Sequence, residues 1–579
     1  MTARLVRILV LGVAALFGLA GLSVVPATPA HADAGGCAGS EIVVNGNKQC
    51  PYVQIQGSGS TWSKNIVDQW IADVSANGIQ VVYTGGGSTK GRQQFARPAA
   101  VDFAISEIPY QGKDENGQAD TSNGRQYAYL PIVAGGTSFT YQLQVGGQMV
   151  RNLRLSGNTI AAIFTNKITN WNDPAITKDN NGRSFPDLPI TPVVRADGSG
   201  TTAQFTSWLD AVYPSIWRPY FGKSGLTSYY PKKAGTNMIS QNGSDQVMNT
   251  IASANGNGSI GYVEYSYPLN ATAADGKPFP VVKVLNKSGY YVEPTQYATA
   301  VGLTKATVRT DLPMSNPLYL TQDLSKVYSN PDPRAYPISS YSYMVIPIGT
   351  DDDTMTTSKR QTLADFMYYS LCTGQTKAGA YGYSPLPLNL VQAGFSQLAR
   401  LRTADKSVQL SDRDVRSCGN PTFDGTNLNK NVLAQKAPMP EACDKVGAGP
   451  CGDSVGTTTT DPSSGTGTGT DPGTDPGTDT NTGPDGATTT TGGGAGANGA
   501  GGGTQVDPGT GEVVYDPATG IPVSEDPAAA AIYASSVTLA EDRDVDRNAF
   551  GWVAVLELLG LVLLPGLLVV ALRRRGMTR

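Results

Sequence analysis

Short runs of β-branched residues alternate with amphipathic stretches over roughly residues 37–451. Four runs have the composition and period of strands, at 79–83, 101–105, 190–194 and 259–263. Three stretches carry apolar residues at helical spacing, at 63–75, at 158–164 behind a Ser156 cap, and at 203–212. This alternation is typical of an α/β fold with mainly parallel sheets, and about 400 residues favour two lobes over one core.

The hydrophobic pattern changes at both ends of the chain. Arg4 and Arg7 precede an apolar run at 8–25 and then small residues, which predicts a signal peptide at 1–34, cleaved after Ala32 or Ala34. Residues 452–548 consist largely of Thr, Gly, Asp, Pro and Ala without lysine, which predicts a disordered stalk.

The last apolar segment predicts a membrane anchor. Residues 549–572 are apolar except for Glu557, and three arginines follow at once, so we expect one transmembrane helix and a cytoplasmic tail at 573–579. The globular part at 35–451 would then lie outside the cell, tethered to the cell membrane.

Composition narrows the chemistry further. The only histidine, His31, lies in the predicted signal peptide, so the mature chain lacks the commonest general base and any histidine-ligated metal site. The net charge of −4 does not favour a nucleic-acid surface. Six cysteines in an exported chain predict structural disulfides rather than a metal site; of the fifteen pairings, proximity in sequence favours Cys37–Cys50, Cys372–Cys418 and Cys443–Cys451.

Three clusters of glycine with serine or threonine stand before predicted helices, at 57–62, 85–89 and 195–202. Two of them directly follow a predicted strand. A helix N-terminus has free N–H groups and a partial positive charge, and glycine lets an anion approach the backbone closely. One such cluster alone is also what a turn with a helix cap looks like. Three clusters with one arginine favour a pocket for a tetrahedral oxyanion.

Particular side chains can supply the donors of such a pocket. Hydroxyl donors are available from Thr61, Ser88, Ser199 and Thr201, whereas Arg195 offers a charge-assisted bond and Asp197 can orient its guanidinium. The chain has no phosphate-loop motif, no dinucleotide fingerprint and no Gly-x-Ser-x-Gly elbow, so we expect no nucleotide, cofactor or metal.

Six segments resemble the phosphate-binding protein of the phosphate-specific ABC transporter, a two-lobed substrate-binding protein of the periplasmic type (type II). Their order and spacing make the resemblance specific, and it runs from about Gln54 to Leu401. The segments are 57–62, 101–107, 155–176, 195–201, 258–265 and 335–338.

The resemblance implies a division into lobes and a set of ligands. Lobe one would comprise about 50–140 and 337–405, lobe two 141–336, and a cysteine-containing extension 406–451 has no assigned role. Phosphate would lie between the lobes. Its ligands would be Thr61, the backbone of Trp62 and Ser88 from lobe one, with Arg195, Ser199, Gly200 and Thr201 from lobe two.

One residue departs from the family pattern. The family has an aspartate that accepts a hydrogen bond from protonated phosphate, and this chain has Glu107 there. Such an acceptor rejects sulfate, which has no proton to donate near neutral pH. Glutamate either keeps that role from a backbone set further back, or suits a different oxyanion such as a phosphonate or a phosphate ester.

The resemblance therefore implies capture of inorganic phosphate and its transfer to a membrane permease driven by a separate ATPase. The long predicted stalk favours an alternative, a surface-displayed phosphate or oxyanion sensor or an adhesin-like protein without a permease. A phosphatase is the third interpretation, and the missing histidine and metal ligands count against an enzyme.

Overall fold

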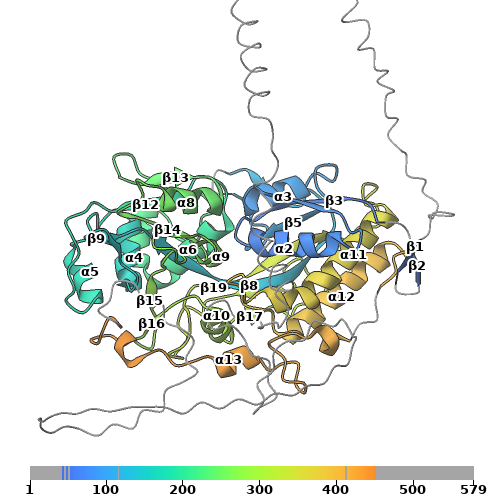
Figure 1. Cartoon of the computed structure of the whole chain (residues 1–579). Helices are drawn as coiled ribbons and strands as arrows, with labels where there is room; N and C mark the ends of the chain where they lie inside the picture. Colours follow the sequence, from blue (N-terminus) through green and yellow to red (C-terminus); the bar gives the residue numbers. More distant parts are fainter. Residues whose placement is uncertain (1–41, 45–46, 50–51, 115–116, 411–413, 452–579) are drawn as a thin grey trace, which may run out of the picture. The chain divides into compact units, whose positions relative to one another are not determined.

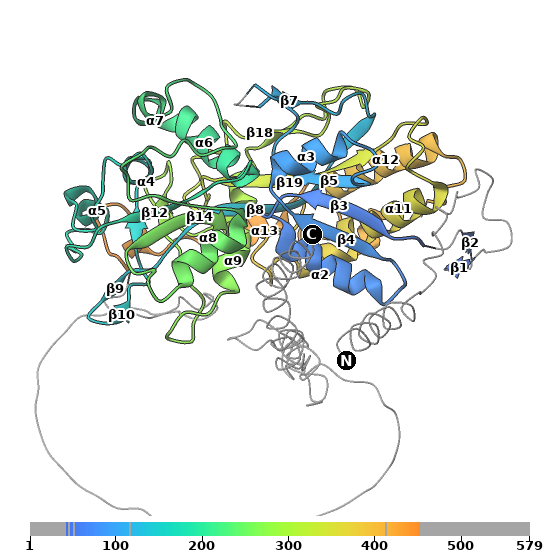
Figure 2. The same ribbon diagram turned by 90° about the horizontal axis from the view of Figure 1, so that it is seen from above.

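The computed structural model describes residues 42–44, 47–49, 52–114, 117–410 and 414–451. One eight-stranded mixed sheet runs through the fold (Figures 1 and 2). Its strands, in spatial order, are β13 (Ile239–Gln241), β12 (Thr191–Arg195), β14 (Ser259–Glu264), β8 (Tyr127–Tyr141), β19 (Ser339–Pro347), β5 (Phe103–Ser106), β3 (Ile55–Gly59) and β4 (Val81–Gly85).

The sheet is parallel toward its two edges and antiparallel at its centre. β3 pairs in parallel with β4 and β5, and β12 pairs in parallel with β13 and β14. β8 and β19 run antiparallel to each other and to their outer neighbours. The expectation of mainly parallel sheets therefore holds only for the outer strands, because two long central strands connect the halves.

The two largest hydrophobic clusters of the described residues divide the fold. Side chains of the first core come from 55–134 and 303–415, and those of the second come from 139–338. We call the part of the fold built around the first core the first half, and the part built around the second core the second half. β8 belongs to both, because its residues 127–136 pair with β19 and its residues 137–141 pair with β14.

In the first half, alternate side chains of a strand enter opposite layers, as the pleat requires. Phe103 and Ile105 face α2 (Lys64–Ser75), α11 (Thr357–Leu371) and α12 (Leu388–Ala404), whereas Ala104 packs with Phe95 of α3 (Ser88–Phe95) on the other face. α2 follows the predicted apolar stripe, since Ile66, Val67, Trp70 and Val74 are buried.

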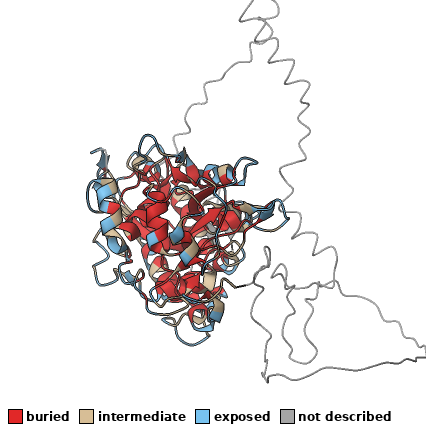
Figure 3. Ribbon diagram, turned by 90° about the vertical axis from the view of Figure 1, so that its left-hand side faces the viewer, coloured by how far each residue is buried: buried red, intermediate tan, exposed pale blue. Residues whose placement is uncertain are grey.

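The second half repeats this layering. Val194 and Tyr262 face α4 (Gly157–Phe164), α6 (Gly200–Val212) and α7 (Pro214–Phe221), whereas Val193 and Val263 face α8 (Gly243–Ala252). Ser156 caps α4 as predicted, accepting the N–H of Thr159. Figure 3 shows the buried residues concentrated inside the fold beneath an exposed rim.

Shorter elements complete the described chain. The helices are α5 (Pro174–Asp179), α9 (Ser266–Leu269), α10 (Gln296–Leu303), α13 (Val432–Lys436), η1 (Thr373–Lys377), η2 (Val415–Cys418) and η3 (Ala442–Asp444). Small sheets are formed by β1 (Ile42–Val44) with β2 (Asn47–Gln49), β6 (Gly112–Lys113) with β7 (Ala119–Asp120), β9 (Gln144–Val145) with β10 (Gln148–Met149), β17 (Thr307–Val308) with β18 (Gln322–Asp323), and β11 (Arg154–Leu155), β15 (Lys283–Leu285) and β16 (Tyr291–Val292) together.

The cysteine-containing extension runs under both halves, along the lower edge in Figure 1. Cys372–Cys418 ties its start to the end of α11. Beyond α13, which packs on α10, Asp444 makes an ion pair of 2.7 Å with Lys283. Cys443 and Cys451 form a second disulfide. Both pairings match the prediction, whereas Cys37 and Cys50 lie outside the described residues.

The predicted signal peptide, stalk, transmembrane helix and cytoplasmic tail (1–34, 452–548, 549–572 and 573–579) also lie outside the described residues. Among the described helices, none has the length and apolar character needed to cross a membrane.

Candidate anion-binding site

The predicted site residues converge where the two halves meet. β3 and β4 end at Gly59 and Gly85, and β12 ends at Arg195, so the residues that follow all leave the carboxyl ends of parallel strands. Ligands of open α/β sheets bind outside these ends. Thr61, Trp62, Ser88, Glu107, Arg195, Ser199, Gly200 and Thr201 are all buried there.

The first cluster stands before a helix as predicted, since α2 begins at Lys64, and its residues Gly57–Gly59 are the end of strand β3. A Cβ on Gly57 would meet the ring of Phe103 at 2.1 Å, which explains the need for glycine there. The N–H of Trp62 donates to Ser60 Oγ at 2.9 Å. The backbone N–H of Trp62 therefore makes a hydrogen bond within its own cluster.

The second cluster contacts the third across the junction. Gly87 has φ +92°, and a Cβ on it would meet Asp197 Oδ2 at 2.5 Å, so a left-handed backbone and a close approach both require glycine. The N–H of Thr89, in the first turn of α3, donates to the carbonyl of Gly198 at 3.0 Å. The starts of α3 and α6 thus face each other.

Glu107 lies between these two helix starts. Its Oε2 accepts the hydroxyl of Ser88 at 2.6 Å, and its Oε1 accepts the hydroxyl of Ser342 at 2.9 Å. Ser88 Oγ in turn accepts the N–H of Gly200 at 3.2 Å. A Cβ on Gly200 would stand 2.0 Å from Glu107 Oε2, so the longer carboxylate fits only because residue 200 is glycine.

Arg195 is held by a bidentate ion pair. Its Nε and one terminal nitrogen donate to the two carboxylate oxygens of Asp197, at 2.7 and 2.5 Å. Burial by itself lowers the pKa of Arg195, but the charge and hydrogen bonds of Asp197 outweigh burial and raise it. The guanidinium stays charged, as an anion site requires, and Asp197 orients it as expected.

The first turn of α6 supplies further donors. Ser199 caps this helix, accepting the N–H of Thr202 at 3.1 Å. Because its oxygen serves as the cap acceptor, the Ser199 hydroxyl hydrogen points elsewhere. The helix dipole adds partial positive charge near Gly200 and Thr201.

Sequence reasoning missed three residues of this junction. Ser244, in the first turn of α8, bonds to both Thr61 and Arg195. Gln204 Nε2 donates to the carbonyl of Glu107 at 2.8 Å, and Ser342 reaches its carboxylate. The Gly243-Ser244 pair behind strand β13 is a fourth cluster of the kind already singled out, whereas no motif marks Gln204 or Ser342.

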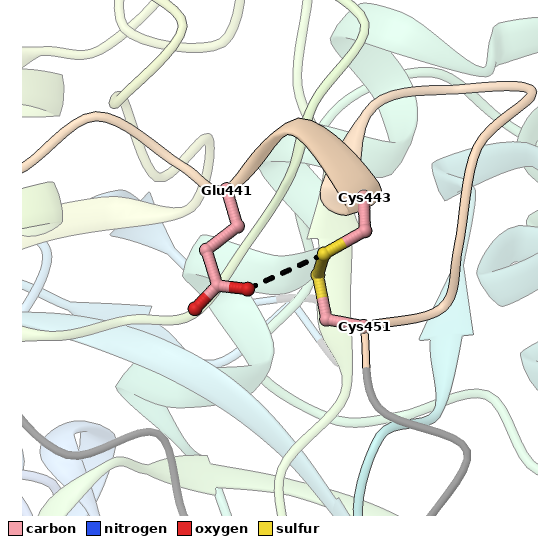
Figure 4. A group of neighbouring side chains, drawn as sticks. All are labelled: Glu441, Cys443 and Cys451. Atoms are coloured by element: carbon pink, nitrogen blue, oxygen red, sulfur yellow. Dashed lines mark hydrogen bonds between the residues drawn. A yellow bond between two sulfur atoms is a disulfide. The ribbon is translucent and has the colours of Figure 1, made fainter. Parts of the chain in front are cut away.

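One group elsewhere has the composition of a metal site, namely Glu441, Cys443 and Cys451 (Figure 4). Both sulfurs are joined in a disulfide, which leaves no thiolate to bind a metal. Glu441 Oε2 lies 3.3 Å from Sγ of Cys443. This group is a disulfide with a neighbouring carboxylate and carries no metal chemistry.

Similarity to known proteins identifies the family of this chain. The PBP superfamily domain matches residues 44–373. Phosphate-binding protein PstS 2 of Mycobacterium tuberculosis is 31% identical over 360 residues, covering 61% of this chain and 87% of the relative. Phosphate-binding protein PstS of Xylella fastidiosa is 30% identical over 351 residues, covering 60% and 85%.

Among solved structures, a phosphate-binding protein from Stenotrophomonas maltophilia matches with a TM-score of 0.45 and 18% identity. The match covers 62% of this chain and 99% of that protein. The family match and the curated relatives carry the assignment. The chain belongs to the PBP superfamily, and within it to the family of the PstS phosphate-binding proteins.

Proposed function

We propose that this chain captures inorganic phosphate and delivers it to an ABC importer. The observation that carries the proposal is the junction itself, where Arg195 with its partner Asp197, the Ser88 hydroxyl, the start of α6 and the carboxylate of Glu107 come together. This chain matches 85% or more of the length of three relatives, and these relatives are named phosphate-binding proteins.

The charges favour a protonated oxyanion. Asp197 neutralises Arg195. The carboxylate of Glu107 therefore gives the junction a formal charge of about −1 before the ligand enters. A fully ionised anion without a hydrogen would meet an uncompensated carboxylate, whereas hydrogen phosphate can donate a hydrogen bond to it. Glu107 would thus select phosphate over sulfate through hydrogen bonding.

Binding without catalysis fits the same residues. The described residues contain no histidine that could serve as a general base, and the Ser199 hydroxyl oxygen accepts the N–H of Thr202. We infer that the site holds its ligand unchanged. Release of phosphate from an aryl phosphate by the purified chain, abolished in Ser199→Ala, would contradict this.

We also infer that the globular part works outside the cell, held by the predicted anchor at 549–572, and passes phosphate to a permease with its own ATPase. Sequence composition supports the anchor, and the family assignment supports the importer. Capture of a permease by the tagged full-length chain from membranes tests the partnership. A phosphate-binding chain that captures none would favour the sensor or adhesin-like alternative.

The direct test of the site is calorimetric titration of the full-length chain with inorganic phosphate and methylphosphonate. We expect phosphate to bind, and Arg195→Ala to weaken it at least 100-fold, because a charged partner is lost in a buried site. Preference for methylphosphonate would instead mean that Glu107 adapts the junction to a different oxyanion.

A further inference from the structure

Ser244 is a fully buried serine in the first turn of α8, in the second half. Its Oγ lies 3.0 Å from Thr61 Oγ1, which belongs to the first half, and it accepts a hydrogen bond of 3.2 Å from a terminal nitrogen of Arg195. Its backbone N–H donates to Thr61 Oγ1 at 3.1 Å. Ser244 thus joins two anion-ligand candidates from opposite halves.

The contact between Ser244 Oγ and Thr61 Oγ1 can run in either direction, and one of the two leaves a donor for a ligand. Arg195 has only donors, so Ser244 Oγ must accept from it and keeps its own hydroxyl hydrogen to donate. When that hydrogen goes to Thr61 Oγ1, the threonine oxygen accepts from both the hydroxyl and the N–H of Ser244. The hydrogen of Thr61 is then left for a ligand in the junction.

The same helix turn also fixes the partner of Arg195. The N–H of Gly243 donates to Asp197 Oδ1 at 3.0 Å, the oxygen that also receives Arg195 Nε. The start of α8 therefore holds the guanidinium through Ser244 and its carboxylate through Gly243. A displacement of α8 would change the direction in which the Arg195 guanidinium points.

We propose that Ser244 is a positioning residue for anion capture, which aims Arg195 and orders the Thr61 hydroxyl through a directed chain from guanidinium to serine to threonine. Successive hydrogen bonds of this kind strengthen one another in a buried site. Because Ser244 and Thr61 lie in different halves, the chain also stabilises the contact between the halves that encloses the ligand. The inference rests on the proposed phosphate function.

The test is titration of the full-length chain with inorganic phosphate. Ser244→Ala removes the acceptor of Arg195 and the donor to Thr61, and we expect the Kd to rise about 10- to 100-fold, since bonds to charged groups contribute most. Ser244→Cys keeps the size of the side chain but has a weak acceptor, and we expect a loss of the same order. It carries the test where the alanine variant fails to fold.

A double-mutant cycle separates positioning from packing. Thr61→Val keeps the shape of residue 61 without its hydroxyl, so the effect of Ser244→Ala should be clearly smaller in that background. Ser370→Ala, at another fully buried serine, which lies in α11 and donates to Phe366 O, is the matched control and should bind as wild type does.

The outcomes are distinct. A Kd within threefold of wild type in both Ser244 variants, or effects of Ser244 and Thr61 that simply add, would overturn the inference while leaving phosphate capture standing. No binding of phosphate by the wild-type chain would overturn the proposed function, and the inference with it.

Discussion

Gly200→Ala tests the fit between Glu107 and the start of α6. The backbone of Gly200 lies outside the left-handed region, so the substitution causes no backbone strain, and alanine is favoured over glycine in helices by up to about 1 kcal/mol. The added Cβ would nevertheless stand 2.0 Å from Glu107 Oε2 and 2.4 Å from Ser88 Oγ. Both groups have to move.

The magnitude follows from the two groups displaced. A hydrogen bond with a charged partner contributes about 1.5–3 kcal/mol, so loss of two costs about 3–6 kcal/mol in binding. At about 1.4 kcal/mol per tenfold, phosphate affinity should fall by about 100- to 10,000-fold. Calorimetric titration measures this loss, and thermal unfolding without phosphate should show a Tm within a few degrees of wild type.

A second substitution makes the reasoning sharper. Glu107→Asp withdraws the carboxylate by one methylene, so the double variant Glu107→Asp/Gly200→Ala should bind phosphate more tightly than Gly200→Ala alone. Ser207→Ala, at a partly exposed position of the same helix, serves as control. Wild-type affinity in Gly200→Ala, or no recovery in the double variant, would refute the account of this contact.

Three further predictions concern other parts of the fold. Arg195→Lys should weaken phosphate binding at least tenfold in the same titration, because lysine cannot reproduce the fork that bonds Asp197 and Ser244 together; unchanged affinity would contradict this. Burial raises the pKa of the Glu264 carboxyl well above its usual 4.5, so the folded state keeps a proton that the unfolded chain releases, and stability falls as the pH rises above about 4.5. The difference in Tm between Glu264→Gln and wild type should therefore shift in favour of the variant from pH 5 to pH 8, whereas the difference for the exposed Glu441→Gln should not. An equal Tm difference for Glu264→Gln at both pH values would contradict this prediction. Removing Cys372–Cys418, which closes 46 residues, should cost about 4 kcal/mol of unfolding free energy, against about 2.5 kcal/mol for Cys443–Cys451, which closes 8; denaturant unfolding that gives the reverse order would refute the chain-entropy argument.

Local patterns predicted the elements well where they are strongly periodic. The stripe of Ile66, Val67, Trp70, Ile71 and Val74 gave α2 within a residue, and the Ser156 cap gave the start of α4. The central strands were not predicted as such. β8 is buried along nearly all of its fifteen residues, so it has no alternation to mark it, and its pairing with β14 and β19 depends on contacts far apart in sequence.

The site was predicted from glycine-rich helix starts and from a family resemblance, and the structure brings those residues together. The partners of those residues could not be found in the same way. Ser342 lies in the middle of β19, where a serine is ordinary, and it reaches Glu107 only because β19 and β5 are neighbours. Gln204 is one polar residue of a mostly buried helix, and its contact with Glu107 depends on how the halves meet.

The central claim is that Glu107 selects phosphate by accepting a hydrogen bond from its protonated oxygen. Titration of the full-length chain and of Glu107→Gln with phosphate and with sulfate, at near neutral pH, tests this most directly. The account predicts that wild type binds phosphate and gives no heat with sulfate, whereas Glu107→Gln, having lost the repelling charge, binds phosphate more weakly and gains sulfate binding. Sulfate binding by wild type equal to that of phosphate, or unchanged selectivity in Glu107→Gln, would contradict it.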